Sequence, residues 1–151
     1  MKYLGLDYGT KTVGVAITDP TGTVVRELTV IRREKRKALR RTLAGIEEII
    51  SKEKVEMIII GMPFNMDGSE GERALDARNF GEMVGRRTGL PVRFQDERLT
   101  TVRAEEIMDE KDLKDVRKRK ACVDSYAAAV ILGDFLNEQN LSHRSMAEKK
   151  E

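Results

Sequence analysis

Three acidic residues occupy conspicuous positions in this sequence: Asp7, Glu97 and Asp124. Asp7 interrupts an apolar segment, residues 3–8, that has the composition of a buried strand. Because an ionised carboxylate in a buried strand is destabilising unless it is paired or bound to a cation, something must compensate its charge. Glu97 belongs to the segment Asp96-Glu97-Arg98, which directly follows the last predicted strand. Asp124 lies in the first turn of a predicted helix that is otherwise lined with Ala, Val, Ile and Leu.

Three carboxylates at one place repel each other unless a hard divalent cation is bound. Mg²⁺ prefers carboxylate oxygens together with substrate phosphate, and two such ions about 4 Å apart would activate a water and stabilise the leaving oxygen of a phosphodiester. Each acid also has a structural explanation. Asp7 can end its strand by bonding to the turn that follows, and Glu97 can pair with Arg98 or start the next helix. Asp124 suits a helix N-terminus because of the macrodipole.

Basic residues are concentrated in two runs, although the formal net charge is only +2. Seven of the ten residues 32–41 and five of the seven residues 114–120 are Lys or Arg. The first run crosses a predicted helix start, where positive charge opposes the macrodipole, so local helix stability does not explain it. Nucleic-acid binding and a solvated face are the two interpretations.

The first two strands are joined by Gly9-Thr10-Lys11-Thr12, which superficially resembles a phosphate-binding loop. A P-loop needs Gly directly before the Lys and a helix afterwards, whereas Thr10 intervenes here and a strand follows. We therefore interpret Gly9 and Gly14 as residues of tight turns. Lys11 remains a predicted contact for substrate phosphate.

The order of elements predicts one mixed α/β domain. A meander of three antiparallel strands is followed by alternating helices and strands, so the later strands add in parallel through right-handed crossovers. The expected strands are residues 3–8, 13–18, 24–31, 57–61 and 92–95. The expected helices are residues 34–53, 70–87, 100–108 and 121–137, the second opened by a capping box of Ser69 and Glu72, with a mobile loop at 109–120. We expect a mixed five-stranded sheet with helices on both faces.

Composition excludes several classes of protein. A chain of 151 residues with 40% hydrophobic residues fits a single domain, residues 1–138, followed by a polar and flexible C-terminal tail, residues 139–151. Cys122 is the single cysteine and there is one His, so neither an internal disulfide nor a conventional structural zinc site is expected. No segment has the length of a secretory signal or a membrane span, and we expect a cytoplasmic protein without membrane attachment.

Five motifs follow one another along the chain. They are Leu4-Gly-Leu-Asp-Tyr-Gly-Thr-Lys11, Gly14-Val-Ala-Ile-Thr-Asp19, Gly61-Met-Pro-Phe-Asn-Met-Asp-Gly68, Asp96-Glu-Arg-Leu-Thr-Thr101 and Val123-Asp-Ser-Tyr-Ala-Ala128. Together they resemble the YqgF family, whose members are named as Holliday junction resolvases and as pre-16S ribosomal RNA nucleases. The resemblance covers residues 2 to about 137 and implies an RNase H-like fold.

The resemblance also implies roles for individual residues. Asp7, Glu97 and Asp124 fall on the family's acidic, metal-binding catalytic positions. Arg98, Thr100 and Thr101 lie in its D-E-R-x-T-T motif and position the substrate. Thr12 stands where family members often carry Arg, and Ala127 stands where related RuvC-type resolvases tend to place a fourth acid. The resemblance therefore leaves undecided whether the site binds one metal ion or two.

The leading hypothesis is a Mg²⁺- or Mn²⁺-dependent endonuclease that processes the end of pre-16S ribosomal RNA, with the small ribosomal subunit as a partner. The first alternative is a Holliday junction resolvase that cuts branched DNA. Such an enzyme normally acts as a dimer, whereas the sequence marks no dimer surface, so we expect a monomer or a weak homodimer.

Two further alternatives come from other classes of protein. One is a non-catalytic, nucleic-acid-binding factor of ribosome assembly, in which the acids are only structural. The other is an actin-like or sugar-kinase ATPase, suggested by the segment Gly5-Leu-Asp-Tyr-Gly-Thr10. Those ATPases close two related domains over a nucleotide, and the length of this chain provides only one.

Overall fold

Five strands form one mixed sheet at the centre of the protein. The computed structural model describes residues 1–33, 39–98, 100–111 and 115–149, and its strand order is β3-β2-β1-β4-β5. The strands are β1 (Tyr3–Tyr8), β2 (Thr12–Thr18), β3 (Val25–Arg32), β4 (Met57–Met62) and β5 (Val92–Asp96). β2 is antiparallel to both β1 and β3, whereas β4 is parallel to both β1 and β5. The predicted mixed sheet is confirmed.

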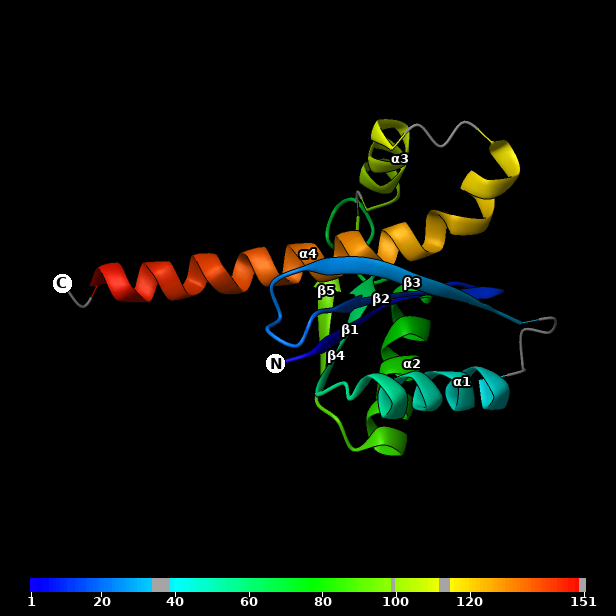
Figure 1. The fold of residues 1–151 in the computed structure, drawn as a ribbon, viewed down its shortest axis with the longest axis horizontal. Helices are drawn as coiled ribbons and strands as arrows, with labels where there is room; N and C mark the ends of the chain where they lie inside the picture. Colours follow the sequence, from blue (N-terminus) through cyan, green and yellow to red (C-terminus); the bar gives the residue numbers. More distant parts are fainter. Residues whose placement is uncertain (34–38, 99, 112–114, 150–151) are drawn as a thin grey trace.

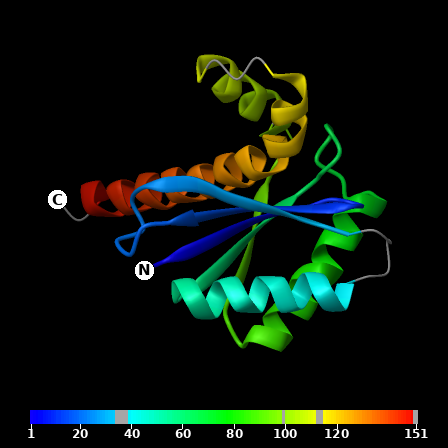
Figure 2. The ribbon, with the colours of Figure 1, turned by 45° about the vertical axis from the view of Figure 1, so that its right-hand side comes forward.

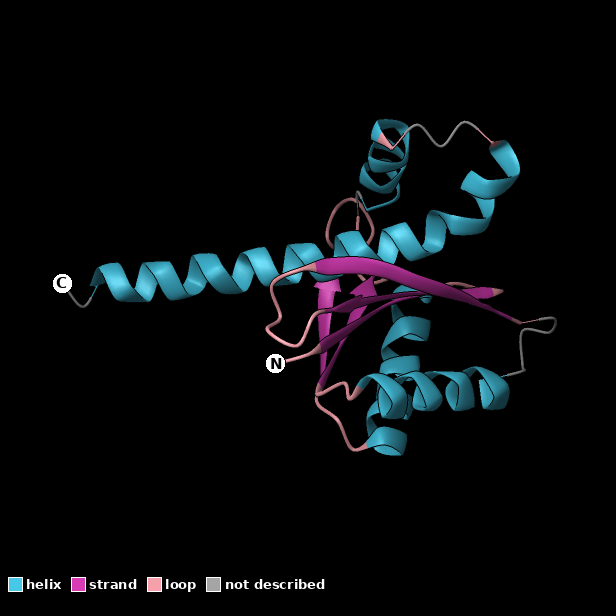
Figure 3. Ribbon diagram, in the orientation of Figure 1, coloured by secondary structure: helices cyan, strands magenta, loops and turns pink. Residues whose placement is uncertain are grey.

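Helices cover both faces of this sheet, as predicted (Figures 1 and 2). α1 (Leu39–Glu53) and α2 (Glu72–Thr88) lie on one face, and α4 (Val116–Lys149) crosses the other. α3 (Thr100–Glu110) packs against α4. Figure 3 shows the strands between these helices. Among the described residues, no helix combines the length and the apolar character that crossing a membrane requires.

Both faces of the sheet bury apolar side chains, and the face toward α4 includes small residues among them. Toward α1 and α2 the strands present large apolar residues such as Leu6 and Ile60, and Phe80 of α2 packs with them. Toward α4 the buried cluster includes Ala16 of β2 and Ala128 of the helix. Large residues such as Ile59 and Leu132 are buried there too, so the small residues are local gaps in an apolar face. The smaller residues allow α4 to lie close to the sheet.

The backbone of α4 lies very close to the sheet at two glycines. A Cβ added at Gly14 would lie 1.9 Å from the carbonyl oxygen of Asp124, and one added at Gly5 would lie 3.0 Å from that of Ala128. Gly14 is therefore a packing residue inside β2, and its interpretation as a turn residue is wrong. Gly9 does lie in the turn between β1 and β2.

The last two helices are longer than predicted. The sequence predicts a loop over 109–120, but α3 runs to Glu110 and α4 begins at Val116, while residues 112–114 lie outside the described residues. α4 also continues to Lys149 and extends beyond the sheet (Figure 1). Polar segments carry no apolar stripe of period 3.6, so periodicity could not find these helix ends. The division into a domain at 1–138 and a flexible tail stays a prediction.

α2 begins without the predicted capping box. Gly71 is the N-cap residue and makes no side-chain cap hydrogen bond. The Ser69 hydroxyl instead donates to Oδ1 of Asp67 at 2.6 Å, so it orders the loop after β4 rather than the helix. Residues 34–38, the predicted beginning of the first helix, lie outside the described residues.

Gly14→Ala should lower the free energy of unfolding and displace α4. The added methyl would overlap the carbonyl oxygen of Asp124, and overpacking of this kind costs about 1–3 kcal/mol or more. Urea unfolding followed by circular dichroism measures the change. Gly133→Ala is the matched control, because an added Cβ there meets nothing within 4 Å and alanine in a helix should stabilise by about 0.5–1 kcal/mol. Equal stability of Gly14→Ala and wild type would contradict the close contact.

Candidate active site

The carboxyl ends of β1 and β5 meet at one edge of the sheet, with β4 between them. Parallel strands direct their carboxyl ends the same way, and this edge is where open α/β sheets place ligands. Asp7 is the penultimate residue of β1, and Glu97 directly follows β5. A Cβ added at Gly61 of β4 would lie 2.5 Å from Oε2 of Glu97. The missing side chain at Gly61 therefore makes room for the Glu97 carboxyl to lie over β4.

Asp7 and Glu97 share a hydrogen bond between their carboxyl groups. Burial, and then the charge of Asp7, raise the pKa of Glu97 to about 9. Burial also raises the pKa of Asp7 to about 6, although the hydrogen bond with Glu97 lowers it. Two carboxyl groups in contact titrate as a pair, and near neutral pH this pair holds one proton between them.

These contacts decide between the explanations that the sequence left open for two of the acids. Arg98 pairs with Asp96, with Nη2 and Oδ2 2.7 Å apart, so the alternative in which Glu97 pairs with Arg98 is wrong. The turn after β1 is closed by the backbone N–H of Gly9, which donates to the carbonyl oxygen of Thr12 at 2.8 Å. The carboxyl of Asp7 instead contacts another acid.

Asp124 approaches this pair from α4. After burial, its charge is a further cause of the raised pKa of Asp7. Oδ2 of Asp124 accepts a hydrogen bond from Oγ1 of Thr12 at 2.5 Å. Gly14, the partner of Asp7 in the pairing of β1 with β2, leaves space here for the helix backbone. Because α4 begins at Val116, Asp124 lies in its third turn, and the macrodipole does not explain its presence.

Asp7 and Glu97 are thus in contact, and the carboxylate of Asp124 lies near them. Within the ranges that the structure describes, no three His, Cys, Asp or Glu side chains are already arranged as a metal-binding cluster. The donor chemistry fits a hard divalent cation, because the site offers carboxylate oxygens and its pair retains a proton that a cation would displace. Metal ligation by Asp7, Glu97 and Asp124 stays a prediction.

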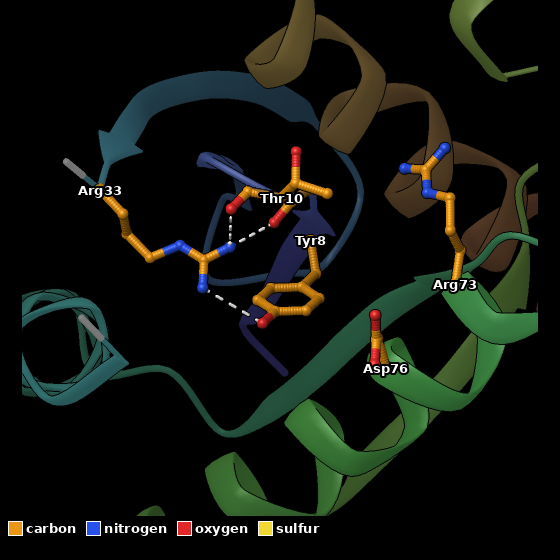
Figure 4. A pocket seen from close by; sticks show the side chains of 6 residues that line it. Tyr8, Thr10, Arg33, Arg73 and Asp76 are labelled. Atoms are coloured by element: carbon orange, nitrogen blue, oxygen red, sulfur yellow. Dashed lines mark hydrogen bonds between the residues drawn. The ribbon is translucent and has the colours of Figure 1, made fainter. Parts of the chain in front are cut away.

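Arg73 is a charged residue of this edge that the sequence analysis did not identify. It is exposed in the first turn of α2. Burial dominates the pKa values of Asp7 and Glu97 and raises both, while the charge of Arg73 opposes that rise in both. Figure 4 shows Arg73 at one side of a pocket, across from Thr10. The position of Arg73 in the sequence could have indicated that it lies near the acids, because α2 follows the loop that leaves the carboxyl end of β4.

The predicted substrate-binding residues lie along the same edge. Lys11 is exposed in the turn between β1 and β2. Arg98 is exposed, and its Nη1 donates to the carbonyl oxygen of Met66 at 3.2 Å, which joins the segments that follow β4 and β5. Thr100 and Thr101 begin α3, but their side chains lie outside the described part of the structure. Substrate contact by these four residues stays a prediction.

The basic run at residues 32–41 is not one solvated surface. Arg33 is only 5% exposed, whereas Arg32 and both arginines of α1 are exposed. Residues 34–38 of the run lie outside the described residues. In the second run, residues 114–120, the described side chains are exposed. Nucleic-acid binding by either run stays a prediction, and Arg33 is set aside from it because its side chain is internal.

Comparison with known proteins identifies relatives over nearly the whole chain. The model of a family described as RuvX, Holliday junction resolvase, matches residues 1–138. A protein of Agathobacter rectalis named "Putative pre-16S rRNA nuclease" is 47% identical over 137 residues, which cover 91% of this chain and 95% of the relative. A protein of Lachnospira eligens with the same name is 45% identical, with coverage of 92% and 99%. These findings confirm the resemblance carried by the five sequence motifs.

Solved structures share the fold. Thermus thermophilus RuvC superposes with a TM-score of 0.58 at 16% identity, covering 93% of this chain and 97% of that chain. The fowlpox virus Holliday junction resolvase gives a TM-score of 0.58 at 13% identity, with coverage of 92% and 99%. At such identities the likeness concerns the fold alone, and it confirms the predicted RNase H-like architecture.

Glu97→Gln should make the metal-free protein more stable at alkaline pH. Folding raises the pKa of Glu97 to about 9, so the folded state binds a proton that the unfolded state releases. The stability linked to that proton is complete below the unfolded pKa and is lost as pH rises through about 5 to 9. Gln keeps a donor for Asp7 and cannot ionise.

Urea unfolding with a chelator present tests this linkage at pH 6 and pH 9. Relative to Glu97→Gln, the wild type should lose about 2 kcal/mol or more between the two pH values. Glu48→Gln, at an exposed position of α1, is the control and should follow the wild type. Parallel curves for wild type and Glu97→Gln would contradict the shared proton.

Proposed function

This chain belongs to the RuvX family, described as Holliday junction resolvases, and we propose that it is an endonuclease that hydrolyses phosphodiester bonds in nucleic acid with a divalent metal ion. The contact between the carboxyl groups of Asp7 and Glu97, with Asp124 beside them, is the observation that carries the proposal. Such a cluster is costly without a cation, and strongly shifted pKa values are typical of functional sites.

Each acid has a defined place in the proposed site. Asp7, Glu97 and Asp124 hold Mg²⁺ or Mn²⁺, which supplies Lewis-acid activation of water and phosphate when bound. Asp7 is the central ligand, because it contacts Glu97 and is affected by the charge of Asp124. Thr12 fixes the orientation of the Asp124 carboxylate through its hydrogen bond to Oδ2.

Basic side chains around the edge contact the nucleic-acid backbone. Arg73 places a guanidinium beside the acidic pair, where it can bind a phosphate near the bond that is cleaved. Lys11 and Arg98 contact neighbouring phosphates, and this part of the affinity weakens as salt rises. Thr100 and Thr101 position the substrate.

The names of the curated relatives favour a precursor of 16S ribosomal RNA as the substrate. On this proposal the protein acts in ribosome biogenesis in the cytoplasm, with the small ribosomal subunit as a partner. The family description favours branched DNA as the second candidate, and RuvC with a Holliday junction substrate has the same fold, with a TM-score of 0.55. Cutting a junction symmetrically requires two sites, whereas trimming an RNA end requires one, so a monomer or weak homodimer suits the RNA.

Asp7→Asn should abolish cleavage and leave the fold intact. The amide removes the negative charge at the centre of the proposed metal site while keeping its size, so cleavage should fall by about a hundredfold or more. The test incubates wild type and variant with a precursor RNA end and with a four-way DNA junction, in Mg²⁺ and in Mn²⁺. Glu48→Gln is the control for loss of an acid elsewhere.

The outcomes separate the candidate functions. Full activity of Asp7→Asn in a clean preparation would refute the assignment of the site. Cleavage of the junction alone by wild type would favour the DNA substrate. Binding of RNA without cleavage of either substrate would favour the non-catalytic assembly factor.

Metal binding should release about one proton near neutral pH. The pair of Asp7 and Glu97 holds that proton in the metal-free protein, because burial and the charge of a neighbouring carboxylate raise the pKa of both carboxyl groups, and a cation must displace it. Calorimetric titration with Mn²⁺ in buffers of different ionisation heat counts the protons, and affinity should rise by about tenfold per pH unit between pH 7 and 8. Affinity that does not change with pH would show that the ion binds without displacing the shared proton.

A further inference from the structure

Arg33 is a buried cation directed at the turn between β1 and β2. Figure 4 shows its guanidinium beside the turn: Nη2 donates to the carbonyl oxygens of Gly9 and Thr10, the latter at 2.8 Å. Nη1 donates to the Tyr8 hydroxyl at 3.2 Å. The backbone N–H of Arg33 donates to the carbonyl oxygen of Lys11 at 2.7 Å. Arg33 therefore contacts four successive residues, from the end of β1 through the turn.

We propose that Arg33 is a positioning residue of the active site, which holds this turn in the conformation that places Asp7 and Thr12. The inference rests on the proposed nuclease function. Asp7 lies two residues before Gly9, and Gly9 is fixed to Thr12 by its backbone hydrogen bond of 2.8 Å. Thr12 then holds Asp124 by its own hydroxyl. If the turn changed conformation, Asp7 and Asp124 would move relative to each other.

Arg33 acts on the acids through geometry rather than by contact with substrate. Its guanidinium carbon lies 4.9 Å from the centre of the Tyr8 ring, and Tyr8 stacks on Phe80 of α2 at 4.1 Å. Tyr8 packs with the core toward α1 and α2, so its neighbour Asp7 faces the side of α4. Arg33 lines the same pocket as Arg73, but its side chain is only 5% exposed and its donors are directed at the turn rather than at the acids.

Arginine suits this position in a way that lysine does not. Its planar fork of donors satisfies two carbonyl oxygens and a hydroxyl at once, whereas a lysine ammonium is a compact point charge on a flexible stem. Burying a cation is costly, and an apolar side chain of similar volume often serves stability as well. A guanidinium that bonds to backbone oxygens is therefore better explained by a need to fix the turn.

Arg33→Lys tests the proposal in the full-length protein. The matched control is Arg86→Lys, because Arg86 is exposed in the last turn of α2 and its Nη2 lies 4.0 Å from Oε2 of Glu82. We would measure kcat, KM and the salt dependence of KM on the substrate that the wild type cleaves. Hydrogen exchange at the amides of Gly9 and residue 33 reports the turn directly.

Arg33→Lys should lower kcat by roughly 10- to 100-fold, because small misplacement of catalytic groups has large effects on rate. KM and its salt dependence should stay within about twofold of wild type, because on this proposal the buried guanidinium of Arg33 bonds to the turn and not to substrate. Both amides should exchange faster than in wild type. Arg86→Lys should match the wild type in every measurement.

An unchanged kcat would overturn the proposal, and so would a raised KM with a weaker salt dependence, because that result would place Arg33 on the nucleic acid. Unfolding of Arg33→Lys at the assay temperature would also overturn it, since the residue would then support the whole fold. Tyr8→Phe removes one acceptor only and should give a smaller fall in kcat.

If the wild type cleaves neither substrate, the proposed function fails. Hydrogen exchange then decides the inference alone, and unchanged exchange would refute it.

Discussion

Two carboxyl groups in hydrogen-bond contact at a half-buried sheet edge resist ionising together, because burial and mutual repulsion both favour the neutral form. Asp7 and Glu97 meet this constraint by sharing one proton. The arrangement becomes less favourable as pH rises, and a divalent cation relieves it by taking the place of the proton. Instability of the metal-free site and affinity for the ion therefore have one physical origin, which the surrounding fold has to support.

The fold makes room for the acidic site by placing glycines next to it. Gly61 leaves the space over β4 that the Glu97 carboxyl occupies, and Gly14 leaves the space for the α4 backbone at Asp124. Glycine inside a strand gives up side-chain packing and costs conformational entropy. The opposite face offsets that loss with large residues such as Leu6 and Phe80, which are fully buried between the sheet and the helices. Both faces bury an apolar core, and the face toward α4 also positions the acids.

Positive charge is used in two different ways around this edge. Arg73 is exposed and opposes the raised pKa values of the acidic pair, so it remains accessible to an anionic ligand. Arg33 is buried, and oxygen atoms of the turn accept hydrogen bonds from both of its Nη atoms. Both are single arginines in charged segments, and only their neighbours in space distinguish a residue that can meet substrate from one that supports the site.

The sequence alone determined the succession of strands along the chain and the mixed sheet, and it indicated the three acids as candidates, because alternation of apolar residues and the spacing of motifs are local properties. It did not determine that Gly14 packs against a helix, that Ser69 bonds to Asp67, or that α4 begins at Val116. Those features depend on contacts between distant segments, or on helical residues that have no apolar period. Only the tertiary structure decided that Asp7 and Glu97 share a proton and that Arg33 is internal. Ionisation and burial are set by neighbours in space, and the neighbours of Glu97 and Arg33 come from other strands and helices.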